Sequence, residues 1–111
     1  MAAVLKQLGQ ARPADTNNVS IYSPGTGVSA IILEIVVCNT TGTAATFRLF
    51  NDDDGTTYDQ TTSLYYDVSV AANTSLQITC KLGMNDSDGN LAVRSGTASA
   101  LTFTVHGTEI T

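Results

Sequence analysis

Leu101-Thr102-Phe103-Thr104-Val105-His106 alternates apolar and polar side chains without a break. A period of two is typical of a β-strand that buries one face and leaves the other in solvent. The alternation predicts that Leu101, Phe103 and Val105 lie in a core and that His106 points outward. This stretch therefore predicts a strand of a two-layered β protein.

The same spacing recurs along the rest of the chain, and turn dipeptides such as Asp54-Gly55 and Asp88-Gly89 separate the apolar segments. Short strands with turns every 8 to 15 residues or so are typical of sandwiches and jelly rolls. We expect one all-β domain over residues 13–111, a single eight-stranded antiparallel β-sandwich or jelly roll. The expected strands centre on Val4–Leu8, Val19–Ile21, Val28–Cys38, Ala45–Leu49, Leu64–Val70, Leu76–Cys80, Leu91–Val93 and Leu101–Val105.

The N-terminal segment, residues 1–12, ends at an Arg12-Pro13 break and allows two interpretations. It is either a short strand of the domain or an arm. An arm of this kind could add a strand to the sheet of a neighbouring molecule.

The composition excludes several classes of protein. Charged residues make up only 14% of the chain, and Glu and Lys, which helical surfaces use most, occur twice each. These counts nearly exclude a helical protein. The net charge of −5 opposes a nucleic-acid groove, which needs clustered Lys and Arg. No apolar run approaches the roughly 18 residues of a membrane span, and the N-terminus lacks a secretory pattern. We expect a soluble protein made in the cytoplasm, with no nucleic-acid or membrane partner.

The residues that could carry chemistry are few. Cys38 and Cys80 are expected to be free thiols, and Cys80 continues an apolar alternation as a small core residue. The run Asp52-Asp53-Asp54-Gly55 lacks the acid that an EF-hand loop needs five residues before its glycine, and it indicates a solvated turn. We expect no catalytic residue, no metal and no cofactor.

Three acids within expected strands, Glu34, Asp67 and Glu109, are the only candidates for the carboxylate pair of a hydrolase. Nothing in their spacing indicates that they converge. Glu34 lies in an apolar strand and needs a partner, and a hairpin between residues 38 and 44 would set it beside Arg48. We expect a structural or inter-subunit salt bridge between Glu34 and Arg48.

The segment Val28–Cys38 is apolar on both phases, which predicts that its second face is also covered. Ala30, Ile32 and Val36 form that face, and its cover is either another subunit or a loop of the same chain. Tyr65 shares the outward phase of Asp67 and is a further contact candidate. The predicted interface residues are Val4, Leu5, Leu8, Ala30, Ile32, Glu34, Val36, Arg48 and Tyr65.

Several short motifs, which together span nearly the whole chain, concern packing and turns rather than catalysis. They are Leu8-Gly9-Gln10 with Pro13, Ile35-Val36-Val37-Cys38-Asn39, Ala45-Thr46-Phe47-Arg48-Leu49, Leu64-Tyr65-Tyr66-Asp67-Val68 and Phe103-Thr104-Val105-His106-Gly107-Thr108-Glu109-Ile110. In this order they resemble a family of small virion proteins of tailed bacteriophages, some of which are capsid decoration, or cement, proteins.

The resemblance implies a non-enzymatic structural protein of the virion, assembled in the host cytoplasm. Such a decoration protein would bind the outer capsid surface as a homotrimer, with the major capsid protein as its partner, and stabilise the DNA-filled head. The alternative is a tail-tip or fibre module that binds a host surface glycan. That alternative needs a concave patch with exposed aromatic side chains, for which Tyr22, Tyr58 and Tyr65 are the candidates.

Overall fold

The computed structural model describes residues 2–111, and within them every regular element is a β-strand. The predicted all-β fold of eight strands in two antiparallel sheets is confirmed. No helix long and apolar enough to cross a membrane occurs in the described part of the chain. The strands are β1 (Ala3–Ala11), β2 (Val19–Tyr22), β3 (Ser29–Asn39), β4 (Ala45–Asp52), β5 (Ser63–Val70), β6 (Ser75–Asn85), β7 (Asn90–Ser95) and β8 (Leu101–Ile110).

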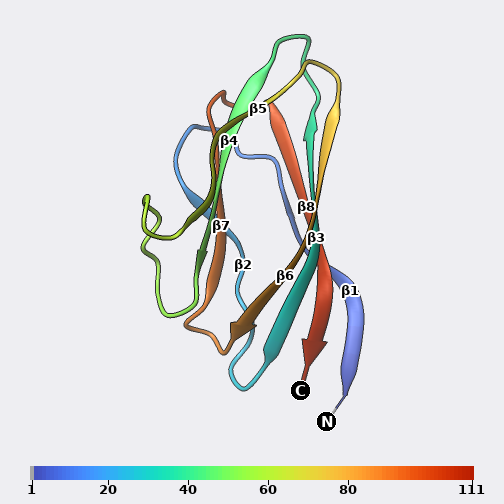
Figure 1. Cartoon of the computed structure of the whole chain (residues 1–111), viewed down its shortest axis with the longest axis vertical. Helices are drawn as coiled ribbons and strands as arrows, with labels where there is room; N and C mark the ends of the chain where they lie inside the picture. Colours follow the sequence, from blue (N-terminus) through green and yellow to red (C-terminus); the bar gives the residue numbers. More distant parts are fainter. Residues whose placement is uncertain (1) are drawn as a thin grey trace.

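The two four-stranded sheets face each other, as Figure 1 shows. Sheet A has the order β1-β8-β3-β6, and sheet B has the order β2-β7-β4-β5. Because strands alternate in direction along the chain, both termini and the loops 23–28, 53–62 and 86–89 lie at one end of the sandwich. We call this the terminal end. The loops 12–18, 40–44, 71–74 and 96–100 lie at the other end.

The core fills the space between the inner faces of the two sheets. Phe103 of β8 and Phe47 of β4 meet edge to face across it, with ring centroids 6.1 Å apart. Leu101, Phe103 and Val105 are fully buried, and His106 is exposed, as the alternation predicts. Each large apolar side chain buried in this way contributes roughly 1.5–3 kcal/mol. The core is thus built from the period-two pattern of the sequence.

The central strand β3 departs from strict alternation. Both of its ladders, to β6 and to β8, shift register between Ile32 and Glu34. A shift of this kind, a β-bulge, turns the following side chains to the opposite face. Ala30 and Ile32 before the shift, and Ile35 and Val37 after it, all point into the core and are almost completely buried.

The prediction that Ala30 and Ile32 form an outer contact face is therefore wrong. Strict alternation placed them with Val36, but the register shift separates the two groups. Val36 lies on the outer face and is half-buried. Ala30 and Ile32, at 2% and 0% exposure, are core residues and are closed to any partner.

The register shift depends on a close contact with β8. Gly107 is paired with Ile32, and a Cβ atom at this position would collide with the backbone oxygen of Ile31. Gly9 has the same role in β1, where a Cβ atom would collide with the backbone oxygen of Ile21 in β2. Glycine is required at both positions because the backbone of the neighbouring strand comes closer than a Cβ atom allows.

The N-terminal segment forms strand β1 of this chain's own sheet. Ala3–Ala11 pairs antiparallel with β8, with one register shift between Gln7 and Gly9. The side chain of Leu8, at that shift, is half-buried against the core. The segment is therefore a strand in the isolated chain.

Substituting Gly107 with Ala should destabilise the fold by about 1–3 kcal/mol, the usual cost of forcing extra volume into a packed site. Gly83→Ala is the matched control, because a Cβ atom there meets no atom within 4 Å. Urea unfolding of both variants measures the difference. Equal stability of the two variants would contradict the proposed role of Gly107.

Candidate functional site

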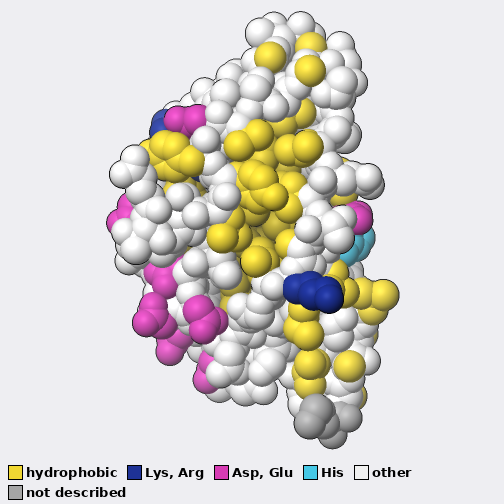
Figure 2. All heavy atoms as spheres, in the orientation of Figure 1, with side chains coloured by type: hydrophobic (Ala, Val, Ile, Leu, Met, Phe, Trp, Pro, Cys, Tyr) yellow, Lys and Arg dark blue, Asp and Glu magenta, His cyan; other side chains and the backbone are white. Residues whose placement is uncertain are grey.

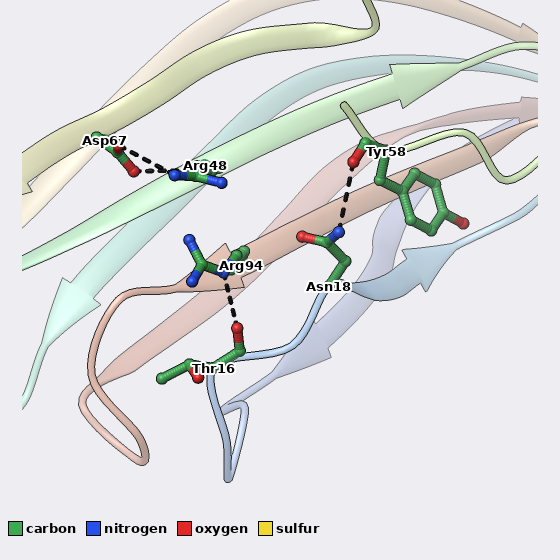
Figure 3. A network of polar contacts seen from close by, with 6 residues as sticks. All are labelled: Thr16, Asn18, Arg48, Tyr58, Asp67 and Arg94. Carbon is green, nitrogen blue, oxygen red and sulfur yellow. Dashed lines mark hydrogen bonds and ion pairs between the residues drawn. The ribbon is translucent and has the colours of Figure 1, made fainter. Parts of the chain in front are cut away.

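The outer face of sheet B carries two of the arginines side by side. Arg48 of β4 and Arg94 of β7 are directly paired across the ladder, and Figure 3 shows both side chains on one side of the sheet. The Arg48 Nε and Nη2 atoms donate to the Asp67 carboxylate at 2.7 Å and 3.1 Å. The Arg94 Nε atom donates to the Thr16 carbonyl at 2.7 Å. These bonds fix both guanidinium groups in place.

The ion pair between Arg48 and Asp67 sets the charge state of both groups. Hydrogen bonding to Arg48 lowers the pKa of the Asp67 carboxyl, and the same bond raises the pKa of the Arg48 guanidinium. Asp67 has a positive φ of 54°, at a register shift of the β4–β5 ladder, and this local turn aims its carboxylate at Arg48.

The predicted salt bridge between Glu34 and Arg48 does not form within one chain, and its inter-subunit form stays a prediction. Glu34 lies on the outer face of sheet A, opposite His106 of β8, whereas Arg48 lies on the outer face of sheet B. Strands β3 and β4 are consecutive in the sequence but belong to different sheets, so no hairpin ladder joins them. Glu34 remains half-buried on its own face.

Alternation predicts that Tyr66 points into the core and Tyr65 points outward, and the structure shows the reverse. Tyr65 points inward and stacks on Phe47 with ring centroids 5.9 Å apart, so it does not share the outer face of sheet B, and its contact role stays a prediction. Tyr66 is exposed, and the Arg48 guanidinium carbon lies 3.9 Å from the centroid of its ring. The cause is the register shift in the β4–β5 ladder, which reverses the faces of β5.

A cavity of about 410 Å³ opens beside this cluster, on the outer face of sheet B. Phe50 points to the outer face but is only 1% exposed, because the loop 53–62 folds back over it. Tyr58 of that loop packs on Phe50 with ring centroids 6.0 Å apart, and Asn18 Nδ2 donates to the Tyr58 carbonyl (Figure 3). The cavity is lined by Arg48, Phe50, Tyr58, Asp59, Gln60, Thr61 and Tyr66.

The acidic loops gather at the terminal end, and Figure 2 shows many acidic side chains grouped on one side there. Asp52 accepts hydrogen bonds from the backbone amides of Thr57 and Asp54, and these bonds, that of Thr57 first, lower the pKa of its carboxyl. Asp53 accepts one from the amide of Asn85 and so links the two acidic loops. Across residues 2–111, no three His, Cys, Asp or Glu side chains form a group that could hold a metal ion.

An exposed apolar area lies on sheet A at the terminal end. Leu5 and Ile31, on either side of Thr108, are paired to it from β1 and β3 and are 72% and 38% exposed. We call Leu5 and Ile31 the terminal apolar patch. Val4 is 53% exposed but is paired with Glu109, in line with Ala30, so it lies on the opposite face of sheet A. The predicted contact roles of Val4 and Leu5 stay predictions.

A second apolar strip lies on the open side of the sandwich, between the edge strands β5 and β6. Its side chains are half-buried against the core, and Figure 2 shows an apolar surface between the two sheets. Edge strands with uncovered apolar side chains are typical sites of association. The strip consists of Tyr65, Val68, Leu76, Cys80 and Leu82.

The thiol of Cys80 belongs to this packing rather than to a reactive site. Its Sγ lies 3.5 Å from the carbonyl oxygen of Ile32, beside the register shift of β3. Burial, followed by the nearby charge of Glu34, raises the pKa of the Cys80 thiol. A raised thiol pKa lowers the fraction of nucleophilic thiolate at neutral pH.

Glu109 holds the first two strands to the last one. Its carboxylate accepts a hydrogen bond from the Tyr22 hydroxyl at 2.6 Å and forms an ion pair with Lys6 at 2.6 Å. Lys6 and then Tyr22 lower the pKa of the Glu109 carboxyl, while burial and Glu109 raise the pKa of Tyr22. Glu34, Asp67 and Glu109 thus have separate surroundings and do not form a carboxylate pair.

Sequence reasoning placed Tyr58 at a concave patch but missed Tyr66, Gln60 and the apolar floor at Phe50. One sequence feature could have indicated the floor. Leu49 and Phe50 are both large and apolar, although they point to opposite faces of β4. This pair of residues indicates that the outer face of β4 is also covered at Phe50. The cover is the loop 53–62, whose path the sequence does not specify.

No known family model matches the sequence, and no curated protein sequence matches it. Solved structures do share its fold. A chain of the T13 IBDV viral particle superposes with a TM-score of 0.55 and 10% identity, over 96% of this chain and 30% of that chain. A chain of the infectious bursal disease virus Gx strain gives 0.52 and 12%, over 98% of this chain and 32% of that chain.

The chain therefore spans about a third of the length of these viral proteins. At this level of identity the likeness is one of fold. Nearly the whole of this chain takes part in it.

Substituting Glu109 with Gln should cost about 1–2 kcal/mol of stability at neutral pH, since a charge-assisted hydrogen bond is lost. The folded pKa of Glu109 lies below its ordinary value of 4.5. Its contribution is therefore present above that pH and is lost as the pH falls through the folded value. Thermal unfolding of wild type and variant across this range should show the two converging in acid. A difference that does not change with pH would contradict the assignment.

Proposed function

We propose that this protein is a non-enzymatic structural component of a virus particle. The observation that carries the proposal is the fold likeness to a chain of a viral particle over 96% of this chain. The strand order supports the jelly-roll interpretation. Pairs β1/β8, β2/β7, β3/β6 and β4/β5 are those of one long antiparallel hairpin rolled into two sheets.

The finer proposal is a capsid decoration protein of a tailed bacteriophage. It binds the outer surface of the capsid as a homotrimer, with the major capsid protein as its partner. The sequence motifs that resemble phage decoration proteins support this role, as does the uncovered apolar surface of the chain. The terminal apolar patch is the proposed contact with the capsid, and the strip between β5 and β6 is the proposed contact between copies.

The mechanism is binding rather than chemistry. Internal pressure from packaged DNA pushes capsid subunits apart, and a trimer that bridges several subunits resists this separation. Each protomer contributes a small contact. Three linked contacts act at high effective concentration, so the trimer binds far more tightly than one protomer does.

Substituting Leu5 with Ser should weaken binding to capsids assembled without this protein by about tenfold per protomer, because roughly 1.5 kcal/mol of apolar burial is lost. Leu64→Ser is the matched control, since Leu64 is 44% exposed on β5, away from the terminal apolar patch. Co-sedimentation with capsids measures both variants. Wild-type protein that stays in the supernatant, or equal binding of the two variants, would contradict the proposal.

The trimer is tested separately by sedimentation equilibrium of the purified chain. The expected mass is three times that of the 11.6-kDa chain. A monomer that persists at millimolar concentration would overturn the trimer, because the apolar strip would then be stable in water.

A further inference from the structure

The cavity on the outer face of sheet B is a built pocket that the proposed structural role does not use. Its floor is the ring of Phe50, which is 1% exposed although it points away from the core. The loop 53–62 covers this ring and supplies one wall, and β4 and β5 supply the other. The volume of about 410 Å³ lies within the range of roughly 300–1,000 Å³ that small-ligand pockets occupy.

The walls of the pocket are fixed before any ligand arrives. Arg48 is held by two hydrogen bonds to Asp67 and by the ring of Tyr66. Tyr58 is held by Phe50 and by the bond from Asn18 to its carbonyl. Preorganised groups bind a ligand with little loss of conformational entropy.

The turn that follows Tyr58 is held as well. Asp59 accepts a hydrogen bond from the amide of Thr61 at 2.8 Å, and its carbonyl accepts one from the amide of Thr62. The hydroxyl of Ser63 donates to the carbonyl of Gln60 at 3.1 Å. This turn leaves the side chain of Gln60 exposed at the rim of the pocket.

The charges at the pocket favour an uncharged ligand. The positive charge of Arg48 is already balanced by Asp67, and Asp59 adds a negative charge to the rim. Arg94, the nearest further cation on this face, does not line the pocket. A phosphate or carboxylate would therefore meet no unpaired cation within the pocket.

The lining also disfavours a purely apolar ligand. Gln60, Thr61, Asp59 and Arg48 present donors and acceptors at the rim, and these groups need polar partners when a ligand displaces water. Arg48 Nη1 makes no hydrogen bond to another described residue, so a donor remains free beside the rings. The pocket thus combines three aromatic rings, those of Phe50, Tyr58 and Tyr66, with several groups that can hydrogen-bond hydroxyls.

We infer that this pocket binds a neutral saccharide, through the rings of Tyr58 and Tyr66 and the polar rim at Gln60. One face of a pyranose ring carries C–H groups, which pack on the negative face of an aromatic ring. Its hydroxyl groups both donate and accept, which matches the mixed side chains of the rim. A shallow pocket of this size fits one or two sugar rings with millimolar affinity.

NMR titration of the full chain with glucose, galactose, mannose, N-acetylglucosamine and lactose tests the inference. At least one of these sugars should shift the backbone amides of residues 48–50, 58–61 and 66 in a saturable way. Tyr66→Ala and Gln60→Ala should each weaken that binding by about three- to tenfold. The matched controls are Leu64→Ala, an exposed side chain of the same strand, and Gln77→Ala, an exposed glutamine on sheet A.

Three results would overturn the inference. They are no saturable shift with any of the five sugars, shifts centred outside the pocket, or stronger binding of acetate or inorganic phosphate at the same amides. Capsid co-sedimentation of the Gln60→Ala variant keeps the two proposals separate. We expect this variant to lose sugar binding and to keep full capsid binding. If the wild-type protein binds sugar but not capsids, the capsid proposal fails and the saccharide site is supported.

Discussion

The register shift of β3 between Ile32 and Glu34 is the constraint on which the rest of the structure depends. Strand β3 lies between β8 and β6, so a change in its phase affects both ladders of sheet A. The shift lets a segment that is apolar on both phases place Ala30, Ile32, Ile35 and Val37 in one core. It requires Gly107 on β8, where no side chain fits against the backbone of Ile31.

The shift also decides which surfaces remain open to partners. Sheet A keeps only a small exposed apolar area, at the terminal end, and not the broad apolar face that strict alternation indicates. Sheet B turns its arginines, an exposed tyrosine and a preformed pocket outward, while its inner face packs on the core. The proposed capsid contact and the proposed saccharide pocket therefore lie on different sheets and act independently.

Period-two alternation predicted the fold class, and it placed the core residues of β8 and β4 correctly, from Leu101 to Val105 and from Ala45 to Leu49. It failed at Tyr65, Ala30 and Ile32, because a register shift is set by partner strands that are distant in the sequence. The ion pair of Arg48 was missed because the wrong neighbouring strand was chosen as its partner. Strand β3, which carries Glu34, lies in the other sheet, whereas β5, which carries Asp67, pairs with β4. Predicting the pocket at Phe50 would have required the path of the loop 53–62, which no local pattern in the sequence specifies.

The phase of β3 can be measured directly by the reactivity of single cysteines. Each would be placed at position 31, 32, 35 or 36 in a chain that carries Cys38→Ser and Cys80→Ala. A thiol reagent should react readily at 31, and faster at 36 than at 35, while 32 and 35 react only when the protein opens. The register shift requires 32 and 35 to behave alike. A chain in which 32 reacts like 36, and 31 like 35, would follow strict alternation and contradict the account.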